Sequence, residues 1–497
     1  MLTRFKVSGF KNLIDVDIRF GPFTCIAGAN GVGKSNLFDA ILFFSSLAEK
    51  PFIDAAMSVR DENGRATDVK SIFHRSGNFT DNIITLEAEM IVPKKDVDDL
   101  GQDAVASITF LRYSIKLGLT EVENTGSQGN IQILKEELSH IKIGDASKHL
   151  LFPHKKPWRD TVIEGRRTAP FISTEKEGSE ALIIIHQDRG ENKGGGRPRP
   201  ILAKNIGRTV LSTLTNATET RTAIIAKREM QSWRLLLLEP TALRKPDKFN
   251  APKKLGSDGS NLPSTLYHLP RTKENFNKEN QFEIETQVYA EVANRLSELI
   301  DDVYEISVDR DEKRELLTLA LTDRSGCTFA ARDLSDGTLR FLAAAVLELD
   351  TQAQGLICLE EPENGIHPAR IPAMIQLLRD ITTNAELPAG SDNPPRQVII
   401  NTHSPAVVAQ VPDDSLLVAE LKENKRGGKR FKSVRFSCLD KTWRAEKRDG
   451  IEIVNKGTLL AYLNPVAAKD EAHEKEHRVI DRDDIQQLLP FPSDNSK

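Results

Sequence analysis

Hydrophobic and polar residues alternate in two short segments near the start of the chain, FKVSGF at residues 5–10 and IDVDIRF at residues 14–20. The apolar segment FTCIAG follows at residues 23–28, and after a glycine-rich turn comes the helically spaced run NLFDAILFFSSLA at residues 36–48. Alternation predicts strands, and apolar residues at helical spacing predict a helix, which here ends before Pro51. This order of strands, loop and helix is typical of α/β nucleotide-binding cores.

Strand and helix patterns alternate again in the second half of the chain. The predicted elements are a helix from about residue 284, strands near residues 304–310, 315–323 and 327–333, a helix from about Asp336, an apolar strand at 355–360, a helix from Pro368 to Arg379, and a strand at 397–402. Such alternation predicts a mainly parallel sheet. The stretch between the two halves has mixed signals, and we expect it to form a compact, largely helical inserted lobe.

The division of the chain follows from these patterns. We expect an N-terminal core part at residues 1–92, the inserted lobe at 93–283, a second core part at 284–420, a basic segment at 421–465 and a charged tail at 466–497. The fold class is therefore α/β, with a basic β-hairpin region toward the C-terminus. No sustained heptads and no internal repeats are present, which excludes a long coiled coil and a solenoid.

Composition narrows the functional classes. Hydrophobic residues make up 39% and charged residues 28% of the 497 positions, and no apolar run reaches the roughly 18 residues of a membrane span. The first residues lack an apolar signal region, so we expect a cytoplasmic protein without a membrane partner. The four cysteines are widely spaced without a CxxC pair, which argues against a disulfide framework or a zinc hook. Because the net charge is only −4, contact with nucleic acid requires a local basic patch.

The segment Gly28-Ala29-Asn30-Gly31-Val32-Gly33-Lys34-Ser35 is a complete GxxxxGK[ST] motif between a predicted strand and a predicted helix. Glycines allow backbone N–H groups to surround phosphate oxygens, while the helix directs its positive end toward them. Lys34 is expected to bridge the β- and γ-phosphates of ATP, and Ser35 to bind Mg²⁺.

Three further segments carry candidate chemistry. Glu360 and Glu361 end an apolar strand, where the first carboxylate, standing in place of the more usual aspartate, would help hold Mg²⁺ and the second would polarise the attacking water. Ser335, Asp336 and Gly337 begin a helix and suit hydrogen bonding to a phosphate, although they could equally be an ordinary capped helix start. His403 follows the strand QVIINT, where ligands of open α/β sheets bind, or is an ordinary loop histidine.

Together these segments resemble the ABC-type ATPases of the SMC/RecF/OLD group, and most closely the RecF-like AAA-family ATPases. GANGVGKSN is similar to their Walker A motif, DLSDGTLRFL to their signature motif, LICLEEPENGIHP to their Walker B motif with D-loop, and VIINTHSP to their switch-histidine segment. The resemblance extends over roughly residues 1–420. No glutamine in the sequence is a convincing match to the Q-loop glutamine of these ATPases.

The resemblance implies that two copies pair head to tail, or assemble further, around ATP and Mg²⁺. Lys34 and Glu361 of one copy would then meet Ser335, Asp336 and Gly337 of the other, with His403 sensing the γ-phosphate. Asn30, Gly31, Val32, Gly33, Ser35 and Asn36 would complete the nucleotide contacts, with Glu363 and His367 as D-loop neighbours. Lys11 stands where relatives often carry a basic residue near the nucleotide, or is an exposed lysine.

The C-terminal region offers two further candidates. Residues 421–448 have eleven Lys or Arg against three Asp or Glu, and Lys429, Arg430 and Lys432 are candidate DNA contacts; the alternative is a β-hairpin with a solvated charged face. His473 to His477 match HExxH, but their polar surroundings favour a solvated helix or tail over a metal site. Asp481 and Asp483 lack the strand and helix of a TOPRIM nuclease, so a partner nuclease would be a separate protein.

The favoured interpretation is an ATP-hydrolysing ABC-type head that couples its nucleotide state to DNA or to an effector nuclease, in anti-phage defence or genome maintenance. The alternatives are a RecF-like DNA repair or replication ATPase, a scaffold that uses ATP as a slow latch, and a nucleotide-binding subunit of a transporter. The length of the insertion and the charge of the tail disfavour the transporter.

Overall fold

The computed structural model describes residues 1–459 except 62–63, 66–67, 77–78, 121–129, 178–179, 189–196, 274–275, 278, 427–428, 447–450, 456 and 458. Met1–Val454 form one compact unit, and a second unit begins at Asn455. The HExxH segment at residues 473–477 and the Asp481 and Asp483 pair lie outside the described residues.

A seven-stranded sheet forms the centre of the first unit. Its order is β16 (Arg234–Leu236), β21 (Gly355–Glu360), β22 (Arg396–Thr402), β3 (Phe23–Ala27), β23 (Leu416–Arg426), β24 (Lys429–Cys438) and β25 (Glu452–Ile453). The first five strands are parallel to their neighbours, which confirms the prediction of a mainly parallel sheet. The carboxyl ends of these strands therefore lie along one edge, where open α/β sheets bind their ligands.

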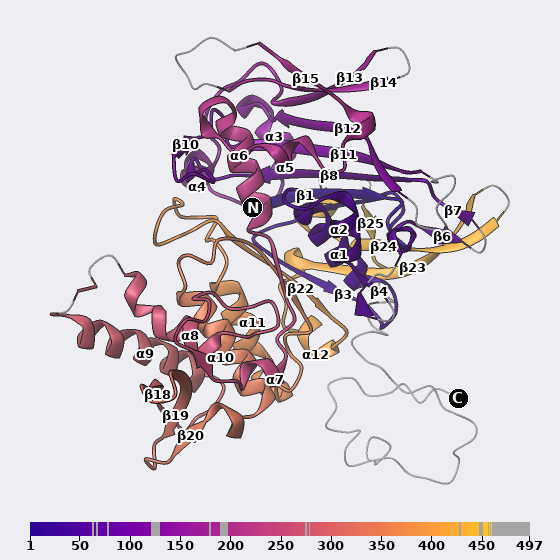
Figure 1. Ribbon diagram of the computed structural model, residues 1–497. Helices are drawn as coiled ribbons and strands as arrows, with labels where there is room; N and C mark the ends of the chain where they lie inside the picture. Colours follow the sequence, from indigo (N-terminus) through magenta and orange to yellow (C-terminus); the bar gives the residue numbers. More distant parts are fainter. Residues whose placement is uncertain are drawn as a thin grey trace, which may run out of the picture. The chain divides into compact units, whose positions relative to one another are not determined.

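Helices cover both faces of this sheet (Figure 1). The connection from β3 through α1 (Lys34–Ser46) to β16 crosses the sheet in one direction. The connections through α10 (Asp336–Leu349) and α11 (Ile371–Asp380) cross it in the other direction. Because such crossovers are right-handed, α1 lies on the opposite face from α10 and α11.

A second, antiparallel sheet of eight strands packs beyond α1 (Figure 1). Its order is β15 (Arg199–Leu202), β14 (Glu180–Ile185), β13 (Ile172–Glu177), β12 (Asn130–His140), β11 (Phe110–Thr120), β8 (Ile83–Ile91), β1 (Leu2–Ser8) and β2 (Val16–Arg19). Phe44 of α1 packs against Phe5 and Tyr113 of this sheet, with ring centroids 5.8 and 5.3 Å apart. Helix α1 thus joins both sheets in one hydrophobic core.

The expectation of a largely helical inserted lobe is wrong. Five strands of the antiparallel sheet, β11 to β15, come from the insertion, and β11 pairs along its length with β8 of the N-terminal part. Buried and exposed side chains alternate along β11 and β12, which is the pattern of a half-buried strand. Because β8 offers an open edge, these segments extend an existing sheet instead of forming a separate helical lobe.

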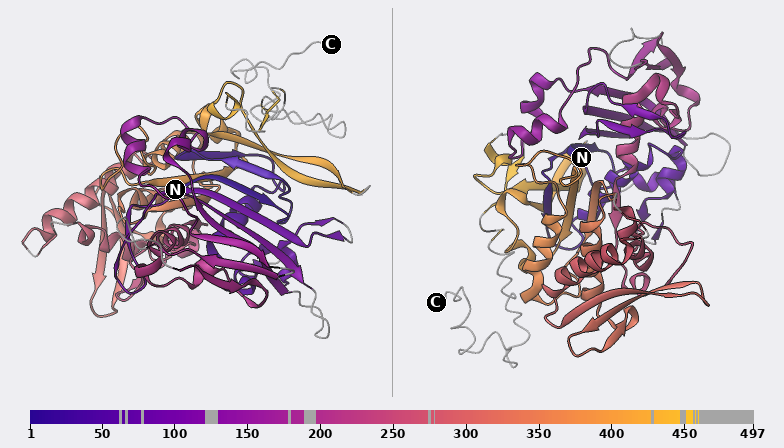
Figure 2. Two further views of the ribbon diagram at one scale, coloured as in Figure 1. Left: turned by 90° about the horizontal axis from the view of Figure 1, so that it is seen from above. Right: turned by 90° about the vertical axis from the view of Figure 1, so that its left-hand side faces the viewer.

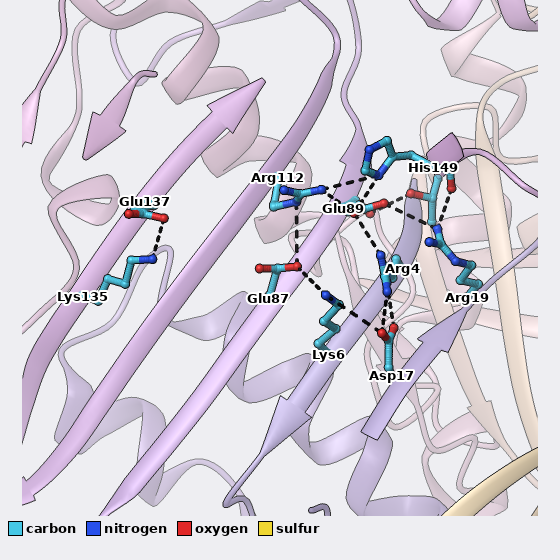
Figure 3. A network of polar contacts seen from close by, with 11 residues as sticks. Arg4, Lys6, Asp17, Arg19, Glu87, Glu89, Arg112, Lys135, Glu137 and His149 are labelled. Carbon is cyan, nitrogen blue, oxygen red and sulfur yellow. Dashed lines mark hydrogen bonds and ion pairs between the residues drawn. The ribbon is translucent and has the colours of Figure 1, made fainter. Parts of the chain in front are cut away.

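The outer face of the antiparallel sheet carries a network of ion pairs (Figure 3). Glu89, only 1% exposed, lies at its centre and pairs with Arg4, Arg19, Arg112 and His149. Burial alone would raise the pKa of Glu89, but the hydrogen bonds and charges of His149 and Arg112 outweigh it and lower this pKa to about 2.

The region after the insertion forms the elements expected from the sequence. Helix α9 (Gln281–Ser297) leads into a small sheet of β18 (Val303–Asp311), β19 (Leu316–Asp323), β20 (Thr328–Ala330) and β17 (Asp247–Lys248). The basic segment forms the β23–β24 hairpin, as the sequence interpretation allowed, and this hairpin extends away from the sheet (Figures 1 and 2).

The remaining α-helices and strands of the described part of the chain are mostly short. They are α2 (Phe52–Met57), β4 (Arg60–Asp61), β5 (Gly64–Arg65), β6 (Arg75–Ser76), β7 (Phe79–Thr80), β9 (Lys95–Val97), β10 (Asp103–Val105), α3 (Ala146–His149), α4 (Lys156–Val162), α5 (Val210–Thr213), α6 (Ala217–Gln231), α7 (Pro240–Leu243), α8 (Leu262–His268), α12 (Pro405–Val408) and α13 (Trp443–Glu446).

Candidate active site

A cleft of about 480 Å³ opens at the carboxyl ends of β3, β16, β21 and β22. This volume is within the range of small-molecule sites. Six residues of the glycine-rich loop and the start of α1 form one side: Asn30, Gly31, Gly33, Lys34, Ser35 and Asn36. The remaining lining residues come from four other segments: Leu237, Leu238, Glu239, Arg340, Glu360, Glu361, Asn364 and Asn401.

The glycine-rich loop depends on backbone conformations that only glycine adopts easily. Gly31 and Gly33 have φ angles of 77° and 106°. A Cβ atom at Gly33 would also lie 2.3 Å from the Asn12 side-chain nitrogen. Asn12 in turn donates to the Val32 carbonyl at 3.0 Å and accepts from the Asn36 side chain at 2.9 Å. Asn12 therefore supports the loop from behind.

Lys34 is buried at the start of α1, and its ammonium group lies across the loop. The Nζ atom donates to the carbonyls of Gly28 at 2.7 Å and Ala29 at 2.9 Å. Burial lowers the pKa of Lys34, and the charges of Glu361, Glu363 and Glu360 oppose this effect. The lysine thus sits among carboxylates at the point where the loop and the strand ends meet.

Glu361 is held in place at the end of β21 by two side chains. His403 Nδ1 lies 2.7 Å from Glu361 Oε1, and Asn364 Nδ2 donates to Oε2 at 2.9 Å. Burial raises the pKa of Glu361, but these hydrogen bonds and the charges of His403 and Lys34 outweigh it, so the pKa is below its ordinary value. Because an ionised carboxylate only accepts hydrogen bonds, His403 Nδ1 carries the proton. The result is a carboxylate of fixed orientation that faces the cleft.

Glu360 also lines the cleft, but a guanidinium group holds both of its oxygens. Arg60 Nη1 and Nη2 donate to Glu360 Oε2 and Oε1 at 2.8 and 2.9 Å. Arg60 Nε donates to Asp39 Oδ1 at 2.8 Å. The oxygen donors of Ser35, Glu360 and Glu361 suit Mg²⁺ in kind, since this ion is bound by one or two carboxylates together with phosphates.

The signature segment begins α10 as expected from the sequence. Ser335 is the N-cap, and its hydroxyl accepts from the Thr338 backbone N–H at 3.2 Å. A Cβ atom at Gly337 would lie 2.3 Å from the Gly365 carbonyl oxygen, so the two loops approach closely only because position 337 is glycine. Ser335 and Asp336 are exposed and do not line the cleft.

Comparison with known proteins places this arrangement in a family. Residues 23–409 match the family described as "AAA domain, putative AbiEii toxin, Type IV TA system". The chain belongs to this family of AAA domains. No functionally curated protein matches the sequence.

Three solved SMC head structures are similar to this AAA domain. An SMC head bound to the C-winged helix domain of ScpA is 12% identical, with 88% of this chain and 98% of that chain covered and a TM-score of 0.42. The SMC head domain from Thermotoga maritima is 11% identical (88% and 99% covered, TM-score 0.36). The Smc head domain with an extended coiled coil bound to the C-terminal domain of ScpA, from Pyrococcus furiosus, is 12% identical (88% and 97% covered, TM-score 0.39).

The family match and the order of the sheet confirm the resemblance to AAA-family proteins and the predicted α/β P-loop fold. The closer likeness to RecF-like proteins stays a prediction. No helix among the described residues is both long and apolar enough to cross a bilayer. Within the same residues, no three His, Cys, Asp or Glu side chains cluster as a metal site.

The structure brings most of the sequence-predicted residues of this AAA domain to the cleft, with some differences. Val32 packs in the core and contributes only backbone near the loop. Glu363 is buried beside Thr402, whose hydroxyl donates to it, and burial raises the pKa of Glu363. His367 caps a short 3-10 turn, and Lys11 is partly buried against Asp39, so neither lines the cleft.

Several residues that line or support the cleft were not anticipated from the sequence. Glu239 lies just after β16, the strand that pairs with β21, and it lines the cleft together with Glu360 and Glu361. Arg340 of α10 donates to the carbonyls of Leu238 at 3.0 Å and Asn364 at 2.6 Å, which ties the signature helix to both sides of the cleft. The available signal for Glu239 was its position directly after the apolar run RLLLL.

The candidate DNA contacts lie apart from the cleft on the β23–β24 hairpin. Arg430 and Lys432 are exposed, whereas the side chain of Lys429 lies outside the described residues. Lys432 is opposite Glu423 across the hairpin, but Arg430 is opposite Lys425. The end of the hairpin therefore places two cations side by side.

Proposed function

We propose that this AAA domain is a cytoplasmic ABC-type ATPase that binds ATP with Mg²⁺ in the cleft, pairs head to tail with a second copy, and hydrolyses the γ-phosphate. The observation that carries the proposal is the meeting of four strand ends. They bring the glycine-rich loop with Lys34 close to the Glu361–His403 pair, although the loop and the pair are hundreds of residues apart in the sequence.

The residues divide the chemistry between them. The N–H groups of the loop and the start of α1 face the phosphates, and Lys34 exchanges its bonds to the Gly28 and Ala29 carbonyls for phosphate oxygens. Glu361, ionised and fixed by His403 and Asn364, orients the attacking water in line with the γ-phosphorus and accepts its proton. Mg²⁺, when bound by Ser35 and Glu360, would neutralise charge on the phosphates.

Pairing of two copies accounts for the exposed signature segment. Ser335 and Asp336 are exposed at the surface. The absence of a side chain at Gly337 lets the start of α10 contact the loop around Gly365. A second copy that offered this tip to the γ-phosphate would supply N–H donors and the positive end of α10.

The hairpin supports a second element of the proposal, contact with DNA. Like charges directly opposite in a hairpin destabilise it, and the Lys425–Arg430 pair would be relieved by a phosphate backbone. A separate effector nuclease as partner, and anti-phage defence as the setting, rest on the resemblance to relatives. A RecF-like repair role and a scaffold that turns ATP over slowly are the alternatives.

Steady-state phosphate release and ATP-dependent dimerisation test the proposal. The purified chain should hydrolyse ATP and shift from monomer to dimer in light scattering. Lys34→Ala should lose ATP binding, and Glu361→Gln should lose turnover by about a hundredfold or more while retaining ATP and the dimer.

Matched controls lie just after the C-terminal end of α1, where Glu49 and Lys50 are exposed. Glu49→Gln and Lys50→Ala should leave both activities unchanged. Unchanged turnover in Glu361→Gln would contradict the assignment of the water-orienting residue. If the wild-type chain hydrolysed ATP more slowly than it exchanged bound ATP with solution, the result would favour a scaffold that uses ATP as a latch over an ATP-hydrolysing enzyme.

A further inference from the structure

The carboxylate of Glu360 has an unusual partner for a residue that lines a nucleotide cleft. Arg60, from the short strand β4, approaches it in a bidentate geometry, with both N–O distances below 3 Å. Such fork-to-fork pairs are among the strongest hydrogen-bonded ion pairs in proteins. Both oxygens of Glu360 are therefore engaged by a cation that belongs to the protein itself.

Arg60 is itself held in position from two directions. Asp39, one turn along α1 from the glycine-rich loop, accepts from Arg60 Nε at 2.8 Å. Lys11 Nζ donates to Asp39 Oδ2 at 2.8 Å and to the Arg60 carbonyl at 2.6 Å. Burial would lower the pKa of Arg60, but the hydrogen bond to Glu360 and the charges of Asp39 and Glu360 raise it. Acidic and basic groups thus alternate from Lys11 through Asp39 and Arg60 to Glu360.

This arrangement changes how Glu360 can meet a metal ion. Arg60 neutralises the charge of Glu360, and the carboxylate lone pairs that it occupies are the ones that Mg²⁺ or its bound water would use. The extra methylene of glutamate, compared with aspartate, allows the carboxylate to reach the guanidinium fork. One carboxylate cannot serve both partners in full.

We propose that Arg60 competes with Mg²⁺ for Glu360 and so sets the Mg²⁺ concentration at which the cleft takes up nucleotide. Arg60 is a positioning residue that acts through Glu360. The inference rests on the proposed function, since it concerns the metal requirement of the same cleft.

Binding of a fluorescent ATP analogue to the full chain, titrated with Mg²⁺ from an EDTA-buffered start, tests this proposal. Arg60→Gln should lower the Mg²⁺ midpoint by about tenfold, because it frees a carboxylate from a partly buried bidentate pair. Analogue affinity in EDTA should stay unchanged. Arg60→Lys, which keeps the charge but loses the fork, should lower the midpoint by about threefold.

Two controls separate this effect from general damage. Arg75→Gln removes an arginine of the same region that pairs only with Asp68 in the described residues, and it should leave the midpoint unchanged. In a Glu360→Gln background, Arg60→Gln should produce no further shift, because the two residues act as one pair. Thermal unfolding should confirm that each variant folds. If Arg60→Gln does not fold, the Mg²⁺ midpoint of Arg60→Lys tests the proposal instead.

The outcomes are distinguishable. A wild-type chain that binds the analogue, together with an unchanged or higher Mg²⁺ midpoint in folded Arg60→Gln or Arg60→Lys, would overturn this inference alone. An equal shift in the Glu360→Gln background would also overturn it. A wild-type chain that binds no nucleotide at any Mg²⁺ concentration would overturn the proposed function together with it.

Discussion

The cleft and the outer face of the antiparallel sheet both carry dense charge, yet they use it in opposite ways. On the outer face, Glu89 is 1% exposed and its four basic partners come from neighbouring strands and α3 (Figure 3). In the cleft, the Glu361 side chain is 31% exposed and its bonds to His403 and Asn364 leave it facing open volume. Charges that face one another across strands hold the sheet together, whereas charges at strand ends remain available to a ligand.

Backbone conformation separates the two regions in the same way. Gly31, Gly33 and Glu361 in the cleft all have positive φ angles, with Glu361 at 45° although it has a side chain. Such conformations cost free energy and are found where function requires them. The residues of the outer-face network lie on regular strands and on α3, without positive φ angles. The cleft is therefore the region where local strain serves a purpose other than stability.

The largest expected effect concerns the proposed contribution of a second copy to the cleft. Ser335→Asp keeps a good N-cap for α10 but places a negative charge toward the γ-phosphate of the partner's ATP, so turnover should fall by roughly a thousandfold. Ser335→Asn, a neutral cap, should keep much more of the activity. Phosphate release and thermal unfolding would be measured side by side, and the melting temperature should not change.

A mixture of Ser335→Asp and Lys34→Ala chains tests whether the signature acts between copies. A mixed dimer has one composite site with an intact Lys34 from one chain and an intact Ser335 from the other, so turnover should recover partly. If Ser335→Asp alone is inactive and the mixture shows no recovery, the segment acts within its own copy. That result would mean that the signature segment acts on the cleft of its own chain, and a head-to-tail dimer would no longer be needed to explain the site.

On the outer face, Glu89→Gln should lower the free energy of unfolding by roughly 3 kcal/mol, because four basic side chains lose their buried counter-charge. ATP affinity should not change, since the network lies away from the cleft. Urea denaturation gives the first quantity and nucleotide titration the second. Glu87→Gln, on the same strand but more exposed, should cost much less. A loss of ATP affinity in Glu89→Gln would mean that the outer-face network also affects the cleft, and that its charges do not serve stability alone.

The same variant has a defined pH dependence. The pKa of Glu89 in the folded state, about 2, is below its ordinary value of 4.5. A depressed folded pKa contributes stability above the unfolded pKa, and this contribution disappears as pH falls toward 2. The difference between wild type and Glu89→Gln should therefore be full at pH 6 and smaller at pH 3. A difference that grows on acidification would contradict the assigned charge state.

Support of the glycine-rich loop from behind should have an intermediate effect. Asn12→Ala removes the hydrogen bond to the Val32 carbonyl and the contact with Asn36, so we expect ATP affinity to fall by about tenfold with little loss of stability. Isothermal titration provides the affinity. Asn294→Ala, an exposed position on α9, serves as the control. Equal affinity in both variants would mean that the loop holds its shape without Asn12.

Sequence alone located the cleft better than it located the lobe that surrounds it. The glycine-rich loop, the two carboxylates after GLICLE and His403 follow apolar strands directly, so their meeting at one sheet edge follows from parallel pairing. The strands of the insertion were missed because some of them pair across intervening helices, as β12 does with β13 beyond α3 and α4. Long-range pairing of this kind leaves no local signal.

Residues that act on the cleft from a distance were missed for a related reason. Arg60 meets Glu360 across 300 residues of sequence, and Asn12 reaches the loop from the turn between β1 and β2. Neither belongs to a motif, and each is recognisable only from its contacts. Glu239 could have been found, since an acidic residue directly after an apolar run is similar to the signal that indicated Glu360 and Glu361.

The smallest expected effect concerns a third charged region, the end of the β23–β24 hairpin. Its Lys425 and Arg430 lie opposite one another without an acidic residue across the strand, unlike Lys422, which pairs with Glu452 at 2.6 Å. Replacing Lys425 and Arg430 by Gln should weaken DNA binding a few-fold and reduce the slope of log affinity against log salt by roughly two. Lys422→Gln is the matched control and should change neither, because its charge is already neutralised. Fluorescence anisotropy with a labelled duplex at several salt concentrations would measure both quantities. If Lys422→Gln weakens DNA binding as much as the replacement of Lys425 and Arg430, the hairpin attracts DNA through its overall charge. Cations with and without an acidic partner would then contribute equally to binding.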